Sequence, residues 1–87
     1  MKKRKQPLGK ENAIGANVER LRRSKGIKQK EFIAKMQVAG ADINPSSYSK
    51  LEGQLRSASD IETYIIAKLL GVQMEDLFSD YDKKRLQ

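Results

Sequence analysis

Apolar side chains recur three or four positions apart along most of this chain, which is the period of helices that bury one face. The pattern predicts helices over about 12–25, 29–37, 45–52 and 60–70, and a short one over 74–78. No stretch of sustained alternation indicates a strand, so the sequence predicts an all-α protein. The residues predicted to be buried are Ile14, Val18, Leu21, Phe32, Ile33, Met36, Tyr48, Leu51, Ile61, Ile65 or Ile66, Ala67 and Leu70.

Polar residues and glycines mark where these helices begin and end. Asn44 followed by Pro45 is typical of a helix start, because the Asn side chain caps free N–H groups and Pro has no N–H to leave unpaired. Ser59 and Glu62 have the spacing of a capping box. Asn12 is predicted to cap the first helix, and Gly26, Gly53 and Gly71 are predicted to end the first, third and fourth.

Charge is unevenly distributed along the 87 residues. The net charge is +7, but residues 1–56 carry 14 Lys and Arg against 5 Asp and Glu, whereas residues 57–87 carry 4 against 6. A chain of this length forms one modest core. We expect that domain over 12–80, with a flexible basic arm over 1–11 and a tail over 81–87. The basic first part indicates a polyanionic partner such as nucleic acid, although lysine-rich solvated helix faces give the same balance.

The residue types that most enzymes and metal sites need are missing. The sequence has no Cys and no His, so we expect no catalytic residue, no metal and no cofactor. Ser47 and Lys50 match an acyl-transfer pattern, S-x-x-K, but patterns this loose arise by chance. No apolar run is long enough for a membrane span or a signal peptide, so we expect a cytoplasmic protein without a membrane partner.

Two short helices, a connection and a third helix with a small polar outer face have the geometry of a helix-turn-helix. The outer face of the helix predicted over 45–52 carries three serines and Lys50, and its only acid, Glu52, lies at the far end. A helix that enters the major groove must bring its first turn to the base edges and keep carboxylates away from phosphates. The pattern therefore favours a DNA-reading helix, although the same serines also suit an ordinary solvated face.

Several motifs together point to one family: Ile14-Gly15 with Val18, Leu21 and Arg22; Gly26 to Gln29 with Phe32; Ser49 to Glu52; Ile66 to Val72; and Leu77-Phe78. With them the chain resembles the phage-repressor/Cro (xenobiotic-response-element) helix-turn-helix family over about residues 13–78. The resemblance implies a five-helix lambda-repressor-like domain in a bacterial or phage transcriptional regulator, in particular a repressor. Its implied partner is a palindromic operator in double-stranded DNA.

The resemblance also implies roles for individual residues. Lys50 is open to two interpretations, since it can contact a phosphate as well as a base. Gln29 is implied to contact a phosphate, and Lys28 beside it belongs to the DNA-binding residues. Asn44, Ser46 and Ser47 are implied to contact bases, with Lys50 one turn later, and Gln54, Arg56 and Ser57 are implied to contact the DNA backbone. Arg22 and Glu52 are implied to form a structural salt bridge.

The chain departs from the family in four places. The connection between the second and third helices is about five residues longer than the usual turn. Ile33 stands where a small Ala is usual, and Pro45 stands where relatives often present a long polar base-reading side chain. Lys28 replaces the usual Ser or Thr cap. We interpret the chain as a variant with a longer turn.

Two matters stay open in the sequence. Met74, Leu77, Phe78 and Tyr81 either close the core or form the seam of a homodimer, and DNA half-sites one helical turn apart favour the homodimer. The alternative to a DNA-binding regulator is a protein-interaction module, such as an antitoxin or adaptor. RNA is a less favoured partner, because aromatic residues that stack on bases make up only 6% of the chain.

Overall fold

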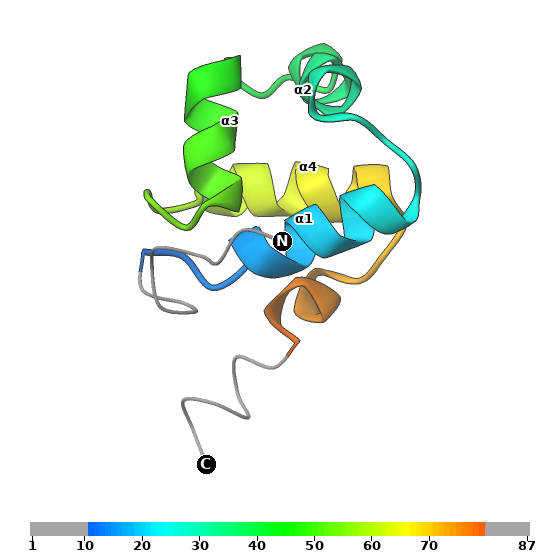
Figure 1. The fold of residues 1–87 in the computed structure, drawn as a ribbon, viewed down its shortest axis with the longest axis vertical. Helices are drawn as coiled ribbons and strands as arrows, with labels where there is room; N and C mark the ends of the chain where they lie inside the picture. The colour runs from blue at the N-terminus through cyan, green and yellow to red at the C-terminus, as the bar shows by residue number, and fades with distance from the viewer. Residues whose placement is uncertain (1–10, 80–87) are drawn as a thin grey trace.

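In the computed structural model, which describes residues 11–79, the protein is built from helices (Figure 1). Its α-helices are α1 (Gly15–Ser24), α2 (Gln29–Val38), α3 (Pro45–Glu52) and α4 (Asp60–Leu70), and they are followed by a short 3-10 helix, η1 (Met74–Phe78). No strand occurs between residues 11 and 79, so the all-α prediction is confirmed for this part of the chain. None of these helices is long and apolar enough to cross a membrane.

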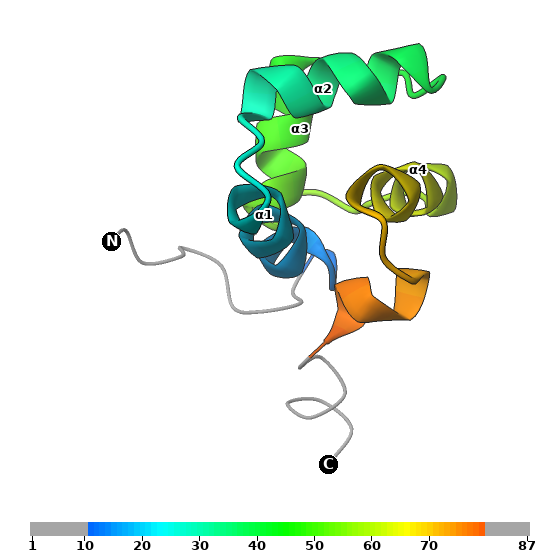
Figure 2. The same ribbon diagram turned by 90° about the vertical axis from the view of Figure 1, so that its right-hand side faces the viewer.

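The helices enclose one core. α3 stands between α2 and α1, α4 contacts both α1 and α2, and η1 packs on α1 and α4 (Figures 1 and 2). The rings of Phe32 and Tyr48 meet at the α2–α3 contact, with their centroids 5.8 Å apart. The large side chains with less than 2% exposure are Ile14, Val18, Phe32, Met36, Tyr48, Leu51, Gln54, Ile66, Leu70 and Leu77.

Two helices begin as their capping residues predict. The Asn44 side-chain oxygen accepts a hydrogen bond from the Ser47 amide (2.8 Å), and Pro45 is the first residue of α3. At α4, the Glu62 amide donates to the Ser59 hydroxyl and the Ser59 amide donates to the Glu62 carboxylate, each at 3.0 Å. The bounds of α3 and α4 follow from these local interactions.

The first helix begins at Gly15, three residues later than predicted. Asn12 does accept hydrogen bonds from the Ile14 and Gly15 amides, but its side-chain nitrogen donates to the carbonyls of Leu51 (2.9 Å) and Arg56 (2.8 Å). The buried Asn12 side chain therefore connects the start of α1 to the last turn of α3 and to the segment that follows it.

Each α-helix ends in the same way, with a hydrogen bond from an N–H to the carbonyl five residues earlier, just after a residue with positive φ. Glycine takes this conformation after α1, α2 and α4, because it has no Cβ to clash. After α3 the residue is Gln54, with φ of 62°, and not the predicted Gly53, whose φ is −79°. The bonds are Ile27 to Arg22, Ala41 to Met36, Leu55 to Lys50 and Val72 to Ala67.

The long connection between α2 and α3 is anchored in the core. Ala41 and Ile43 are 8% and 6% exposed, so this loop buries two apolar side chains. The Gln37 side chain donates a hydrogen bond to the Ile43 carbonyl (2.8 Å) and holds the loop against the last turns of α2. The additional residues therefore set the position of α3 and do not detach it from α2.

Three predictions about apolar residues need correction or refinement. Leu21, predicted to be buried, is only partly buried and packs against the core. Ile61 is 64% exposed and not buried, because it lies in the first turn of α4, ahead of the buried segment that starts at Thr63. In the C-terminal apolar group, Leu77 is fully buried, whereas Met74 and Phe78 are each 39% exposed. Tyr81, like most of the predicted arm and all of the predicted tail, lies outside the described residues.

Candidate nucleic-acid interface

The outer face of α3 carries short polar side chains and one lysine. Asn44, Ser46 and Lys50 are exposed, and Ser47 is partly buried. No acidic residue occurs in the first turn of α3. The only carboxylate of this helix, on Glu52, is 4% exposed and points into the protein. A polyanion approaching this face therefore meets hydroxyl groups and a positive charge, without a repelling carboxylate from α3.

The start of α2 lies beside this face. Gln29 is partly buried, because its carboxamide nitrogen donates to Glu52 (3.0 Å) and its oxygen accepts from the Ser49 hydroxyl (3.3 Å). Lys28 and Lys30 flank Gln29 and are exposed, and neither forms an ion pair with any residue from 11 to 79. The structure therefore brings the predicted residues of α2 next to those of α3. Lys30 is an additional exposed cation beside this face, and the family pattern does not indicate it.

The carboxylate of Glu52 is the centre of a buried network that holds α1, α2 and α3 together. Arg22 donates from Nε to Oε2 (2.6 Å) and from Nη2 to Oε1 (3.1 Å). The Tyr48 hydroxyl donates to Oε2 (2.5 Å), and Gln29 donates to Oε1 (3.0 Å). The salt bridge implied by the resemblance is present, with side chains 6% and 4% exposed. The tyrosine hydroxyl in this network was not foreseen, because spacing alone predicted only that Tyr48 is buried.

The network favours one protonation state of each of its two titratable donors, Arg22 and Tyr48. The hydrogen bond to Glu52 raises the pKa of Arg22, against the opposing effect of burial. Burial raises the pKa of Tyr48 well above its ordinary range, and the hydrogen bond to the Glu52 carboxylate raises it further. Arg22 therefore stays charged and Tyr48 stays a neutral donor, so the end of α3 is held in one position.

The segment after α3 is held by Arg56. Its guanidinium donates from Nε to the Ser47 carbonyl (2.9 Å), and from Nη1 and Nη2 to the two carboxylate oxygens of Glu62 (3.0 and 2.9 Å). Nη1 also donates to the Ser57 carbonyl (2.7 Å). Most of the donors of Arg56 are thus used within the protein, and the side chain joins α3 to the start of α4. Ser57 is exposed beside it.

Gln54 is placed differently from the prediction. The side chain of Gln54 is fully buried, and its backbone N–H donates a hydrogen bond to the Leu51 carbonyl (3.1 Å). Neither group is presented at the surface, so the predicted contact of Gln54 with a DNA backbone is not available in this conformation. The family pattern could not indicate this, because burial of Gln54 depends on the close packing of Gly15 on the end of α3.

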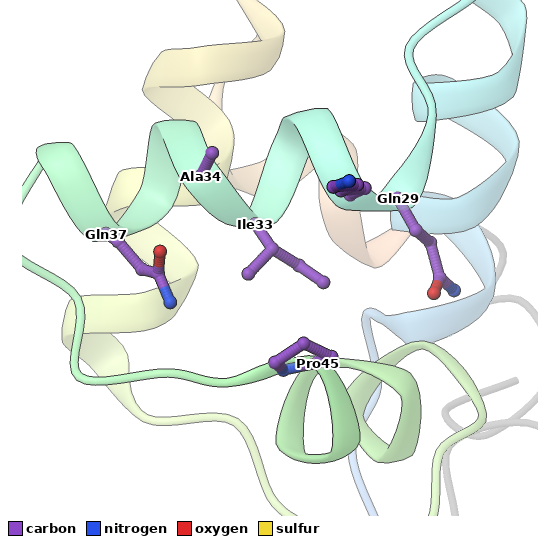
Figure 3. A pocket seen from close by; sticks show the side chains of 6 residues that line it. Gln29, Ile33, Ala34, Gln37 and Pro45 are labelled. Carbon is purple, nitrogen blue, oxygen red and sulfur yellow. The ribbon is translucent and has the colours of Figure 1, made fainter.

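A shallow apolar hollow opens between α2 and the first turn of α3. Figure 3 shows Ile33 pointing from α2 toward Pro45, with Gln29 and Gln37 on either side. Its charged lining residue is Lys30, and no carboxylate lines it. Ile33 and Pro45 are two of the departures from the family pattern, but that pattern did not indicate that they face each other across a hollow.

Comparisons of this chain with protein-family models, with curated proteins and with solved structures found no match.

Proposed function

We propose that this protein is a sequence-specific double-stranded DNA-binding transcriptional regulator, a repressor, in which α2 and α3 form a helix-turn-helix of a five-helix lambda-repressor-like domain. α3 enters the major groove and reads bases with Asn44, Ser46 and Ser47 in its first turn. Lys50, Lys28 and Lys30 contact phosphates or base edges around it.

One observation carries this proposal: the outer face of α3 has small polar side chains and a lysine, while its single carboxylate is buried in an ion pair. A solvated helix tolerates acids on its surface, whereas a helix placed between phosphates is repelled by them. The excess of basic residues over 1–56 supports the same partner.

A palindromic operator follows if the protein binds as a homodimer. One helix-turn-helix makes few base contacts, and two copies related by a twofold axis bind half-sites roughly 34–36 Å apart. Met74 and Phe78, each 39% exposed on η1, are the apolar residues that we assign to the dimer contact.

The test is selection from a random duplex library, with fluorescence anisotropy at two salt concentrations. We expect an enriched palindrome whose affinity falls steeply with salt. A variant with Ser46, Ser47 and Lys50 replaced by Ala should lose the sequence preference. A control with Ile61 and Tyr64, exposed on α4, replaced by Ser should keep it. Retention of duplexes without enrichment would contradict a sequence-specific regulator.

A protein-interaction module is the second candidate, and exposed apolar residues outside α3 favour it. Val38 is 90% exposed and lines a second shallow hollow with Ala34, Ala39 and Leu69. In this case the Ile61 and Tyr64 control, or a Val38→Ser variant, would lose the partner, while the α3 variant would retain it.

A further inference from the structure

The hollow between α2 and α3 is apolar at its floor and polar at its rim. Ile33 from α2 and Pro45 from α3 face each other and form the floor (Figure 3), and Ala34 is also among the lining residues. The carboxamide nitrogens of Gln29 and Gln37 donate to Glu52 and to the Ile43 carbonyl, so these two side chains are held in place as walls. The hollow is therefore a fixed apolar surface and not a gap that a glutamine side chain is free to fill.

The hollow also lies at the position where base reading is proposed. Pro45 is exposed and directly precedes Ser46 and Ser47 in the first turn of α3. Lys30 at the rim of the hollow is exposed and attracts phosphate groups. None of the lining residues has a carboxylate that would repel a phosphate. A DNA duplex that places its major groove over this turn brings base edges to the hollow.

We propose that this hollow receives the C5-methyl group of a thymine, which makes Ile33 and Pro45 specificity-determining residues. The inference rests on the proposed DNA-binding function and adds to it a base preference that the serines and Lys50 do not supply. Among the four bases, only thymine presents an apolar group in the major groove, and apolar side chains are what contact it.

Duplex DNA suits this hollow better than a small-molecule ligand does. Only six residues from two helices line it, so a bound small molecule would remain open to solvent over much of its surface. Ligand pockets generally bury most of their ligand. A duplex provides the missing cover itself, because the bases and phosphates around the methyl group close the hollow from above.

The experiment uses the full chain and the duplex enriched from the random library. Each thymine is replaced in turn by deoxyuridine, which keeps the base-pairing groups and removes only the methyl group. We expect one position in each half-site at which affinity falls about fourfold, the value for one buried methyl group. Uridine at the other thymines should change affinity little.

Two variants connect this effect to the hollow. In Pro45→Ser, the cap from Asn44 remains and the Pro45 part of the apolar floor is lost. In Ala34→Gln, a long polar side chain replaces a methyl group that lines the hollow. Both should bind the thymine and uridine duplexes equally at that position. Val38 is an exposed apolar residue of α2 that does not line this hollow. Val38→Ser should therefore keep the wild-type discrimination between thymine and uridine. Circular dichroism confirms that each variant is folded.

The outcomes separate the two proposals. Loss of affinity at one thymine, abolished by Pro45→Ser or Ala34→Gln, supports the inference. An enriched duplex that tolerates uridine everywhere, or folded variants that keep full discrimination, overturns the inference and leaves the DNA-binding function intact. If no duplex is enriched, both proposals fail at the selection, before any uridine is introduced.

Discussion

Gly15, the first residue of α1, packs directly on the main chain of Leu51 at the end of α3. A Cβ on Gly15 would lie 2.3 Å from the Leu51 carbonyl oxygen and 2.8 Å from that of Glu52. Backbone atoms cannot move aside as a flexible side chain does, so Gly15→Ala must push α1 away from α3. This contact explains why the chain has glycine at a helix start, where its backbone freedom is otherwise unfavourable.

We expect Gly15→Ala to lower the free energy of unfolding by about 3 kcal/mol or more, as for overpacked cores. Gly26→Ala is the control, because Gly26 has φ of 71° but no neighbour within 4 Å of a new Cβ. Its cost is the strain of a left-handed residue alone, about 1–2 kcal/mol. Urea denaturation measures both, and equal losses would show that the α1–α3 contact is looser than described.

Breaking the buried ion pair from one side should be costly. Arg22→Met leaves the Glu52 carboxylate buried without its main counter-charge, and we expect a loss of about 3–5 kcal/mol. Replacing Glu52 by Gln in the same chain removes that charge, so the double variant should be more stable than Arg22→Met. Arg23→Met is the control, since its pair with Glu19 is at the surface, with Arg23 70% exposed. A double variant less stable than Arg22→Met would contradict this account.

Tyr48 should make stability fall at alkaline pH. Burial and the Glu52 carboxylate raise its pKa in the folded state above the unfolded value of about 10. Its contribution is therefore complete below about pH 10 and is lost as the pH rises further. Tyr48→Phe should cost about 1.5–3 kcal/mol at neutral pH, as for a hydrogen bond to a charged group, and should weaken the alkaline decline. Tyr64→Phe, at a residue 52% exposed, is the control in thermal unfolding from pH 8 to 11.

Glu62 should make the stability of the protein fall at acid pH. Burial opposes its ionisation, but hydrogen bonds from Arg56 and Ser59 prevail and lower its pKa in the folded state. Its contribution is present above the unfolded value of about 4.3 and is lost as the pH falls through the lower folded value. Glu62→Gln should therefore destabilise the protein at pH 7 and flatten the decline between about pH 5 and 3. Glu75→Gln, at an exposed site on η1, is the control in urea denaturation.

What the sequence predicted well is local, and what it missed depends on packing between helices. Asn44, Pro45 and Ser59 define helix starts through their own neighbours, so the bounds of α3 and α4 follow from a few residues. Ile61 was expected in the core because its type fits, yet the pattern does not show that the buried part of α4 starts only at Thr63.

The candidate site divides along the same line. The polar face of α3 could be predicted from residue types at helical positions, and the Arg22–Glu52 pair from the resemblance to the family. The burial of Gln54 and the hollow at Pro45 could not, since they depend on how closely α1 and α2 approach α3.

The proposed interface makes a quantitative prediction about salt. Lys28, Lys30 and Lys50 are exposed around the α2–α3 face, and each phosphate that a lysine contacts adds about −0.9 to the slope of log affinity against log salt. Replacing one of them by Ala should therefore reduce the slope by about 1 if that lysine contacts a phosphate. A lysine that contacts a base should instead relax the sequence preference at one position, which resolves the two interpretations of Lys50.

Lys68 provides the matched control for this series. It lies on α4 with its ammonium group 5.4 Å from the centre of the Tyr64 ring, and it is exposed like the others. Lys68→Ala removes the same charge from the net total but not from the proposed interface, so the slope on the enriched duplex should hardly change. If Lys68→Ala and Lys30→Ala changed the salt slope equally, binding would depend on the total charge of the protein. The α2–α3 face would then not be the DNA-binding surface.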